Sequence, residues 1–340
     1  MLTARQKVLR RFWHAVIPLD HLKSGPKPFR LLGENIVLFL DERGAPAALQ
    51  NRCCHRTAQL SKGWCENGQI VCGYHGWTYN REGELTRIPQ FDPETKLPKH
   101  RVKPYRCQAR YGYAWVALDD PIRPLFEIPE ENDPKYRRIP QFYAEWQTAA
   151  LRLMENSFDN AHFSFVHKGT FGNMHKPKPG RYKIEETEPG FYAEAVTNAL
   201  NPPKAFPITG CTEPQIDRLL RSNWYLPFGR RFDMEFPSGI RHIIISYATP
   251  VDDDRMQMVQ FIYRNDTEAD CPAQTLVDWD AAIIAEDKEI LESTDPDVML
   301  DVSAKMEAHM PSDQPSLIIR RRLLELLRSY GEPEVTREYS

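Results

Sequence analysis

Two short segments, Cys53-Cys54-His55-Arg56 and Cys72-Gly73-Tyr74-His75-Gly76-Trp77, decide the fold of the first part of the chain. Sixteen residues separate His55 from Cys72. Each half predicts a tight loop, because Gly63, Gly73 and Gly76 permit close turns beside the cysteine and histidine positions. A cysteine and a histidine one residue apart are poorly spaced for a single tetrahedral metal. They can instead reach two adjacent metals.

Two such loops facing each other supply one iron with two thiolates and a second iron with two imidazoles. That ligand set is the one of a Rieske [2Fe–2S] cluster. Zinc is the competing metal. Zinc sites mostly use Cys-x₂₋₄-Cys or His-x₃₋₅-His pairs, and neither spacing occurs in these two loops. The residues on both sides of the loops predict a small antiparallel β domain over residues 1–120. Its clearest strands are residues 36–40 and 111–118.

Residues 121–140 are rich in proline and charge and predict a linker. Residues 141–340 then predict a second domain, whose strand candidates are residues 182–184, 191–196, 231–236, 242–247 and 256–263. Helical patterns precede and follow these strands. The expected fold class is α+β, with an antiparallel sheet packed on helices.

The second cluster of polar residues is Asn156-Ser-Phe-Asp-Asn-Ala-His-Phe-Ser-Phe-Val-His167. Apolar residues recur at three- and four-residue steps from Leu151 to Phe165, which predicts a helix with Asp159 and His162 one turn apart. His162 and His167 are five residues apart and do not share a helix face. If both imidazoles converge, we expect the helix to be broken or bulged between them.

Asp287 lies within the apolar stripe of a helix expected over residues 277–293. A carboxylate on a buried stripe is costly unless it is paired or binds a metal. A buried ion pair with an arginine is one explanation. The other is a 2-His-1-carboxylate site with His162 and His167, the ligand set of non-heme Fe(II) oxygenases. Glu286 and Asp295 are the nearest rival carboxylates.

Composition excludes several classes of protein. The 340 residues carry a net charge of −3, which gives no general attraction for nucleic acid or acidic membranes. No apolar run approaches the roughly 18 residues that span a bilayer. Seven cysteines, two of them adjacent, make a poor disulfide framework, so we expect a reducing, cytoplasmic location.

Both Cys/His loops, including the His-Gly-Trp of the second, resemble the Rieske domain of Rieske non-heme iron oxygenases. The segment around Asp287 resembles the corresponding helix of the single-subunit monooxygenases: dicamba and vanillate O-demethylases, methylxanthine N-demethylases and saxitoxin-pathway hydroxylases. The resemblance implies an N-terminal Rieske domain and a catalytic domain of the helix-grip type. It implies that Cys53 and Cys72 bind one cluster iron, that His55 and His75 bind the other, and that His162, His167 and Asp287 bind a mononuclear Fe(II).

The resemblance also implies partners. A flavin- or ferredoxin-type reductase supplies electrons from NAD(P)H, O₂ is the oxidant, and a small ring-containing molecule is hydroxylated or loses an N- or O-methyl group. Electrons would cross a subunit boundary in a homotrimer, or a multiple of one, with Asp159 bridging a cluster histidine to an iron-bound histidine. Asn156 matches a position near the iron. It would bind substrate or water, or cap a helical turn.

Three alternatives remain open from the sequence. One is cis-dihydroxylation of an aromatic ring by the same metals. The second is a Rieske electron carrier with an unrelated second domain. The third is a zinc-stabilised binding module.

Overall fold

The computed structural model describes residues 1–337, which form two compact units. One unit comprises residues 4–125 together with residues 249–253. The other comprises residues 126–248, residues 254–337 and the first three residues. None of the helices found in residues 1–337 has both the length and the apolar content needed to cross a bilayer.

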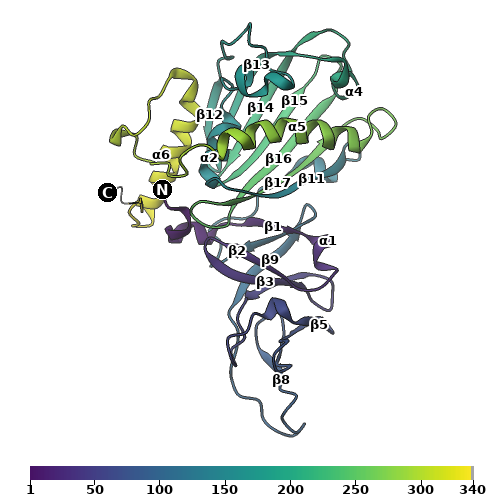
Figure 1. Ribbon diagram of the computed structural model, residues 1–340, viewed down its shortest axis with the longest axis vertical. Helices are drawn as coiled ribbons and strands as arrows, with labels where there is room; N and C mark the ends of the chain where they lie inside the picture. Colours follow the sequence, from purple (N-terminus) through teal and green to yellow (C-terminus); the bar gives the residue numbers. More distant parts are fainter. Residues whose placement is uncertain (338–340) are drawn as a thin grey trace. The chain divides into compact units, whose positions relative to one another are not determined.

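The first unit consists of two antiparallel sheets (Figure 1). The six-stranded sheet has the order β1-β10-β9-β4-β3-β2, and the four-stranded sheet has the order β5-β6-β7-β8. The strands are β1 (His14–Pro18), β2 (Lys27–Leu31), β3 (Glu34–Leu40), β4 (Pro46–Gln50), β5 (Trp64–Glu66), β6 (Gln69–Val71), β7 (Thr78–Tyr79), β8 (Leu85–Arg87), β9 (Pro104–Arg110) and β10 (Tyr113–Ala117). A short helix, α1 (Leu19–Leu22), follows β1.

Apolar runs explain the strands of this unit. Every residue of β10 is buried, and so are Ile36 to Phe39 of β3, as the sequence of both strands predicts. The turn between β9 and β10 places both Tyr111 and Gly112 at positive φ, the backbone that a two-residue hairpin turn requires. The first Cys/His loop lies between β4 and β5, and the second joins β6 to β7.

The second unit is built on one antiparallel sheet of seven strands in the order β11-β17-β16-β15-β14-β13-β12 (Figure 1). The strands are β11 (Arg137–Trp146), β12 (Lys183–Thr187), β13 (Gly190–Leu200), β14 (Gln215–Tyr225), β15 (Gly229–Glu235), β16 (Arg241–Pro250) and β17 (Met256–Arg264). All five strand candidates from the sequence are confirmed. The sequence reading missed β14, and β11 begins at Arg137, within the segment expected to be a linker.

Helix α5 (Ala273–Leu291) runs across one face of this sheet (Figure 1). It contacts α2 (Ala150–Phe158), which in turn contacts β15 and α6 (Gln314–Ser329). Two four-residue helices, α3 (Phe163–Val166) and α4 (Phe206–Thr209), lie in the loops. An antiparallel sheet covered by helices is the α+β class that the sequence predicts.

The prediction of one helix from Leu151 to Phe165 is wrong in its length. Helix α2 ends at Phe158, and Asp159 has extended backbone angles. The break therefore lies before His162, whereas the sequence placed it between His162 and His167. One helical turn, α3, joins the two histidines, and a 3₁₀ turn begins at His167.

Candidate active site

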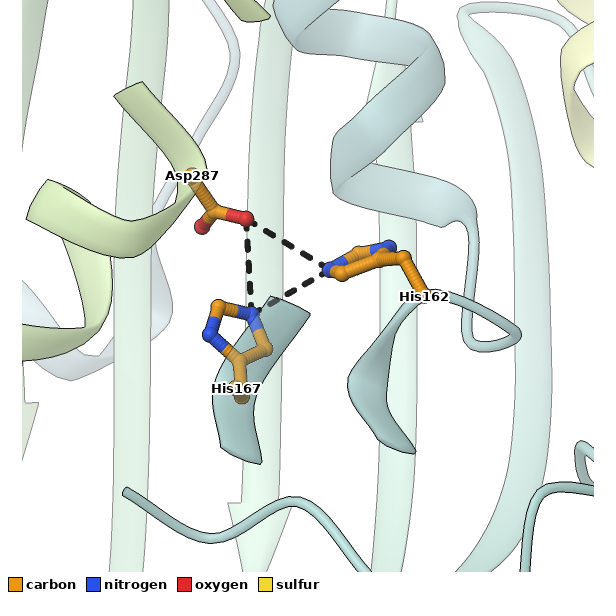
Figure 2. A group of neighbouring side chains, drawn as sticks. All are labelled: His162, His167 and Asp287. Carbon is orange, nitrogen blue, oxygen red and sulfur yellow. Dashed lines mark hydrogen bonds and ion pairs between the residues drawn. The ribbon is translucent and has the colours of Figure 1, made fainter. Parts of the chain in front are cut away.

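Two histidines from one loop, His162 and His167, converge with the distant Asp287 beside α5 (Figure 2). His162 and His167 come from the two ends of α3, and Asp287 comes from α5. The Nε2 atoms of the two histidines are 3.2 Å apart. Asp287 Oδ1 lies 3.5 Å from His162 Nε2 and 3.4 Å from His167 Nε2. The sequence predicted this set of residues.

The backbone around α3 explains how two histidines five residues apart can meet. The short helix α3 is a single turn, closed by hydrogen bonds from the Phe165 and Val166 amides to the His162 carbonyl. The chain then turns back, and the Gly172 amide donates to the His167 carbonyl at 2.7 Å. A Cβ at Gly172 would collide with the Phe163 carbonyl oxygen, so this close turn requires glycine.

Each of the three side chains has a further hydrogen-bond partner that fixes its orientation. Asp159 Oδ2 lies 3.2 Å from His162 Nδ1, and Glu286 Oε2 lies 3.0 Å from His167 Nδ1. Asn156 Nδ2 donates to Asp287 Oδ1 at 3.0 Å. Such outer partners hold metal-binding histidines in one tautomer and one ring orientation.

Glu286 is the residue whose place the sequence reading missed. The sequence offered it as a rival to Asp287, yet its carboxylate faces His167 Nδ1 and accepts hydrogen bonds from the Gly169 amide and the Thr170 hydroxyl. Because neighbouring residues on a helix point about 100° apart, a broad helix face can present both Glu286 and Asp287 to one imidazole. Asp295, the other rival, accepts a hydrogen bond from the Asp297 amide.

The protonation of the site suits metal binding. Burial works to raise the pKa of Asp287, but His167, His162 and Asn156 outweigh it and hold that pKa below its ordinary value. Burial likewise works to raise the pKa of Asp159, and hydrogen bonds from His162 and from nearby amides hold it below its usual range. Both carboxylates are therefore ionised near neutral pH.

The three donor atoms fit one metal ion. Their mutual distances of 3.2, 3.4 and 3.5 Å place a common point about 1.9 Å from each, close to the 2.0–2.2 Å bonds that imidazole and carboxylate make to zinc. Two histidines and one carboxylate on one side of an ion leave its other positions open. This is the facial triad of non-heme Fe(II) oxygenases.

A cavity adjoins the three donor atoms and encloses about 1000 Å³, part of it open to solvent. It lies between α5, α3 and the inner face of the sheet. Its apolar lining includes Phe163, Phe171, Leu200, Ile216, Phe232, Met234, Ile244, Met258, Trp279 and Ile283. A mostly apolar hollow of this size with a few polar groups is typical of a small-molecule site.

In the first unit, the two Cys/His loops meet at their tips. The thiols of Cys53 and Cys72 are buried, and the rings of His55 and His75 have centroids 4.5 Å apart. Gly63 and Gly73 allow this approach, since a Cβ on Gly63 would collide with the Val71 carbonyl oxygen and one on Gly73 would lie 2.8 Å from the Lys62 carbonyl oxygen. All seven cysteines are free thiols.

This loop pair fits a [2Fe–2S] cluster. Within residues 1–337, His55 Nδ1 is buried and has no hydrogen-bond partner. Burial raises the pKa of Cys72 against the effect of amide hydrogen bonds from Tyr74 and His75, and the neighbouring Cys53 thiol raises it further. Two thiolates placed together therefore need a cation between them, and amides directed at sulfur are suited to a cluster ligand.

Other loop residues surround these four. Trp77 stacks on His55 with ring centroids 4.5 Å apart, so it lies beside a proposed cluster ligand. Arg56, which follows His55 in the first loop, is exposed. Tyr79 Oη lies 3.1 Å from Cys53 Sγ and 3.2 Å from the sulfur of Cys54, which is half-buried.

Family models match the two parts of the chain that carry these sites. Residues 12–106 match the model of the Rieske [2Fe-2S] domain, and residues 146–329 match that of the vanillate O-demethylase oxygenase C-terminal domain. Among curated proteins, methylxanthine N1-demethylase NdmA of Pseudomonas putida is 27% identical over 98% of this chain and 93% of its own length.

Solved structures give the same result. An NdmA mutant of Pseudomonas putida with caffeine aligns with a TM-score of 0.80 and 26% identity, covering 98% of this chain and 99% of that one. Dicamba monooxygenase bound to dicamba aligns with a TM-score of 0.79 over 95% of this chain and 98% of that one, and at 20% identity it supports the fold alone. The relatives are oxygenases, which rules out the electron-carrier and zinc-module alternatives. With its Rieske [2Fe–2S] domain and its vanillate O-demethylase type of catalytic domain, the chain belongs to the Rieske non-heme iron oxygenases, as the terminal oxygenase component that uses a Rieske cluster and a mononuclear iron.

Proposed function

We propose that this oxygenase removes a methyl group from a nitrogen or oxygen atom of a small ring-containing molecule. In this proposal His162, His167 and Asp287 hold the mononuclear iron, and Cys53, His55, Cys72 and His75 hold the cluster. The observation that carries the proposal is the convergence of three metal-ligand atoms at the wall of a cavity lined by aromatic and aliphatic side chains. Demethylation itself is suggested by the activity for which NdmA is named.

The reaction balances as a monooxygenation. One oxygen atom of O₂ is inserted into a methyl C–H bond, and the other leaves as water. Two electrons from NAD(P)H and two protons complete the balance. The hydroxymethyl product then loses formaldehyde and leaves the demethylated ring. The bound iron supplies open coordination positions for oxygen chemistry.

Named side chains hold this site in place. Asp159, Glu286 and Asn156 each contact one of the three metal-binding side chains and fix its direction. We propose that Asp159 has a second role, as the link by which an electron enters from a cluster histidine of another subunit. This role requires a homotrimer or a multiple of one, and a separate reductase to supply the cluster.

The test is a substrate screen of the holoenzyme with a generic reductase, scored for formaldehyde and for NADH oxidised per product. We expect roughly three iron atoms per chain and formaldehyde in equal amount to product. His162→Ala should keep the Rieske paramagnetic resonance signal, lose one iron per chain and form no product. The absence of a Rieske signal from the wild-type protein would contradict the proposal. So would a screen in which every methylated ring compound that reacts is hydroxylated and none releases formaldehyde.

A further inference from the structure

Two arginines, Arg218 and Arg230, line the cavity. The Asp287 carboxylate acts on Arg230, whereas no acidic group of the described chain acts on Arg218. Arg218 on β14 and Arg230 on β15 both reach it, and Arg218 is only 7% exposed. Within residues 1–337, neither guanidinium forms an ion pair or a hydrogen bond to oxygen, and the Nε atom of each is buried without a partner. The contacts of Arg218 are the ring of Phe171, with its centroid at 4.5 Å, and Met234 Sδ at 4.0 Å.

Other buried arginines of the described chain have carboxylates beside them. Arg264 pairs with Asp266, and Arg320 lies between Glu155 and Glu307. Arg218 is buried like these two, with an exposed fraction of 7% against 0% and 5%, but within residues 1–337 it has no Asp or Glu at ion-pairing distance. A buried charge without a counter-ion costs several kcal/mol. The position of Arg218 is therefore explained if an anion enters the cavity.

Arg218 remains charged at neutral pH. Burial lowers the pKa of both Arg218 and Arg230 to about 10, which still leaves each protonated. Arg230 is better accommodated than Arg218, because its guanidinium lies over the rings of Phe232 and Phe158, at 3.9 and 5.3 Å. Arg218 has one ring and a thioether sulfur.

The two arginines start from separate points of the sheet that forms the cavity wall. Arg230 on β15 lies opposite Trp224 of β14. Trp224 is six residues from Arg218, which is also on β14. At about 3.3 Å per residue, their backbones are roughly 20 Å apart along the strand. Arg218 is the arginine on which no acidic group of residues 1–337 acts, so it is the one whose charge calls for a partner from outside the protein.

We propose that the substrate is a ring-containing carboxylate whose carboxylate group pairs with Arg218. This inference rests on the proposed function, because it names the substrate class of the same cavity. Arginine presents two parallel N–H donors to a carboxylate, which gives direction as well as affinity. The methylxanthines for which NdmA is named carry no carboxylate, so this chain would differ from it in substrate charge.

The spacing suits one ring. The Phe171 ring that lies under Arg218 has its centroid 4.7 Å from that of His167. The guanidinium carbon is therefore at most about 9 Å from the His167 ring, the sum of two contact distances. An aromatic carboxylate paired with Arg218 would have its ring in the cavity that His162, His167 and Asp287 also line. Ile216 and Met234 line the same part of the cavity with apolar surface.

The test measures binding to the holoenzyme without reductase under argon, by calorimetry. Three acid–amide pairs are compared: benzoate with benzamide, para-methoxybenzoate with para-methoxybenzamide, and phenylacetate with phenylacetamide. We expect at least one acid to bind about tenfold or more tightly than its amide. Arg218→Gln should abolish this preference and leave amide affinity unchanged, while Arg218→Lys should keep part of it.

Arg221→Gln is the matched control. Arg221 lies on the same strand, faces away from the cavity and pairs with Glu235 at 2.7 Å, so its loss should not affect the preference. Equal affinity for acid and amide in all three pairs would overturn the inference. A preference that persists in Arg218→Gln, as direct binding of carboxylate to iron would give, or that is lost only in Arg230→Gln, would also overturn it. Circular dichroism and the mononuclear iron content of each variant report folding of the second unit. The binding test measures no turnover, so its failure would not affect the proposal that the enzyme demethylates rings. In the same way, failure of the formaldehyde assay would not affect the result of the binding test.

Discussion

His167 is held at both ring nitrogens by adjacent residues of α5. Its Nδ1 lies 3.0 Å from Glu286 Oε2, and its Nε2 lies 3.4 Å from Asp287 Oδ1. Glu286 also accepts hydrogen bonds from Gly169 and Thr170, so one carboxylate fixes both the imidazole and the turn that follows it. The pair of acidic residues therefore couples the helix to the α3 loop at the proposed iron site.

Replacement of Glu286 by glutamine should weaken the site without removing a metal ligand. The variant loses the charge that faces His167 Nδ1 and one of the acceptors for the loop. Loss of such an outer contact typically lowers metal affinity or activity by about 10–100-fold. We expect mononuclear iron, measured after dialysis against a chelator, and turnover to fall within that range. Glu289→Gln changes the charge of the same helix at an exposed position and should behave as wild type. Wild-type iron retention and turnover in Glu286→Gln would show that the contact has no role.

Replacement of Asp159 by asparagine should separate iron binding from electron supply. Asparagine can still accept a hydrogen bond from His162 Nδ1, so we expect the cluster signal and the iron content to stay normal. Turnover should fall by roughly 100-fold, because the carboxylate charge next to the proposed electron route is lost. Stopped-flow reduction of the cluster followed by single-turnover product formation locates the defect. Asp217→Asn, an exposed carboxylate of β14, is the control. Wild-type turnover in Asp159→Asn would remove the proposed role.

The sequence predicted the chemistry of both sites better than the local backbone. The ligand residues follow from residue type and spacing, and long apolar runs such as β3 and β10 were readable for the same reason. The position of the helix break was not predictable from periodicity. The backbone of Asp159 is extended because its carboxylate accepts from the Ala161 and His162 amides, a local competition that no apolar pattern reports.

The missed strand and the missed residue have a common physical origin. Strand β14 reads Gln-Ile-Asp-Arg-Leu-Leu-Arg-Ser-Asn-Trp-Tyr, and its buried face includes Arg218 and Ser222. A charged side chain at a buried position disrupts the apolar alternation by which strands are recognised. In the same way, Glu286 could not be distinguished from a solvated acidic residue, because its partners His167 and Thr170 are more than a hundred residues away. Functional side chains thus hide the pattern of the elements that carry them.

The stability of the first unit should depend on pH through His14. This imidazole is fully buried with its Nε2 2.9 Å from the Leu9 carbonyl oxygen, and burial lowers its pKa to about 4. The unfolded chain takes up a proton near pH 6.5, whereas the folded chain does not until about pH 4. The free energy of unfolding should therefore fall as the pH decreases from 6.5 to 4, by about 1.4 kcal/mol per pH unit. Urea unfolding at pH 7, 6 and 5 measures this slope, and His14→Gln should flatten it. Parallel profiles for the two proteins would exclude His14 as the cause.

The reduction potential of the cluster should depend on Tyr79. Its hydroxyl lies 3.1 Å from Cys53 Sγ and 3.2 Å from Cys54 Sγ, and burial together with these two thiols raises the pKa of Tyr79, so the hydroxyl stays protonated. As an iron ligand Cys53 can only accept, so the hydroxyl donates to it and stabilises the electron-rich reduced cluster. We expect Tyr79→Phe to lower the potential, on the order of tens of millivolts, in a redox titration followed by paramagnetic resonance. Cys54→Ala removes the other neighbour, keeps the Tyr79–Cys53 contact and should shift the potential less. An unchanged potential in Tyr79→Phe, or a larger shift in Cys54→Ala, would mean that the hydroxyl serves Cys54 instead.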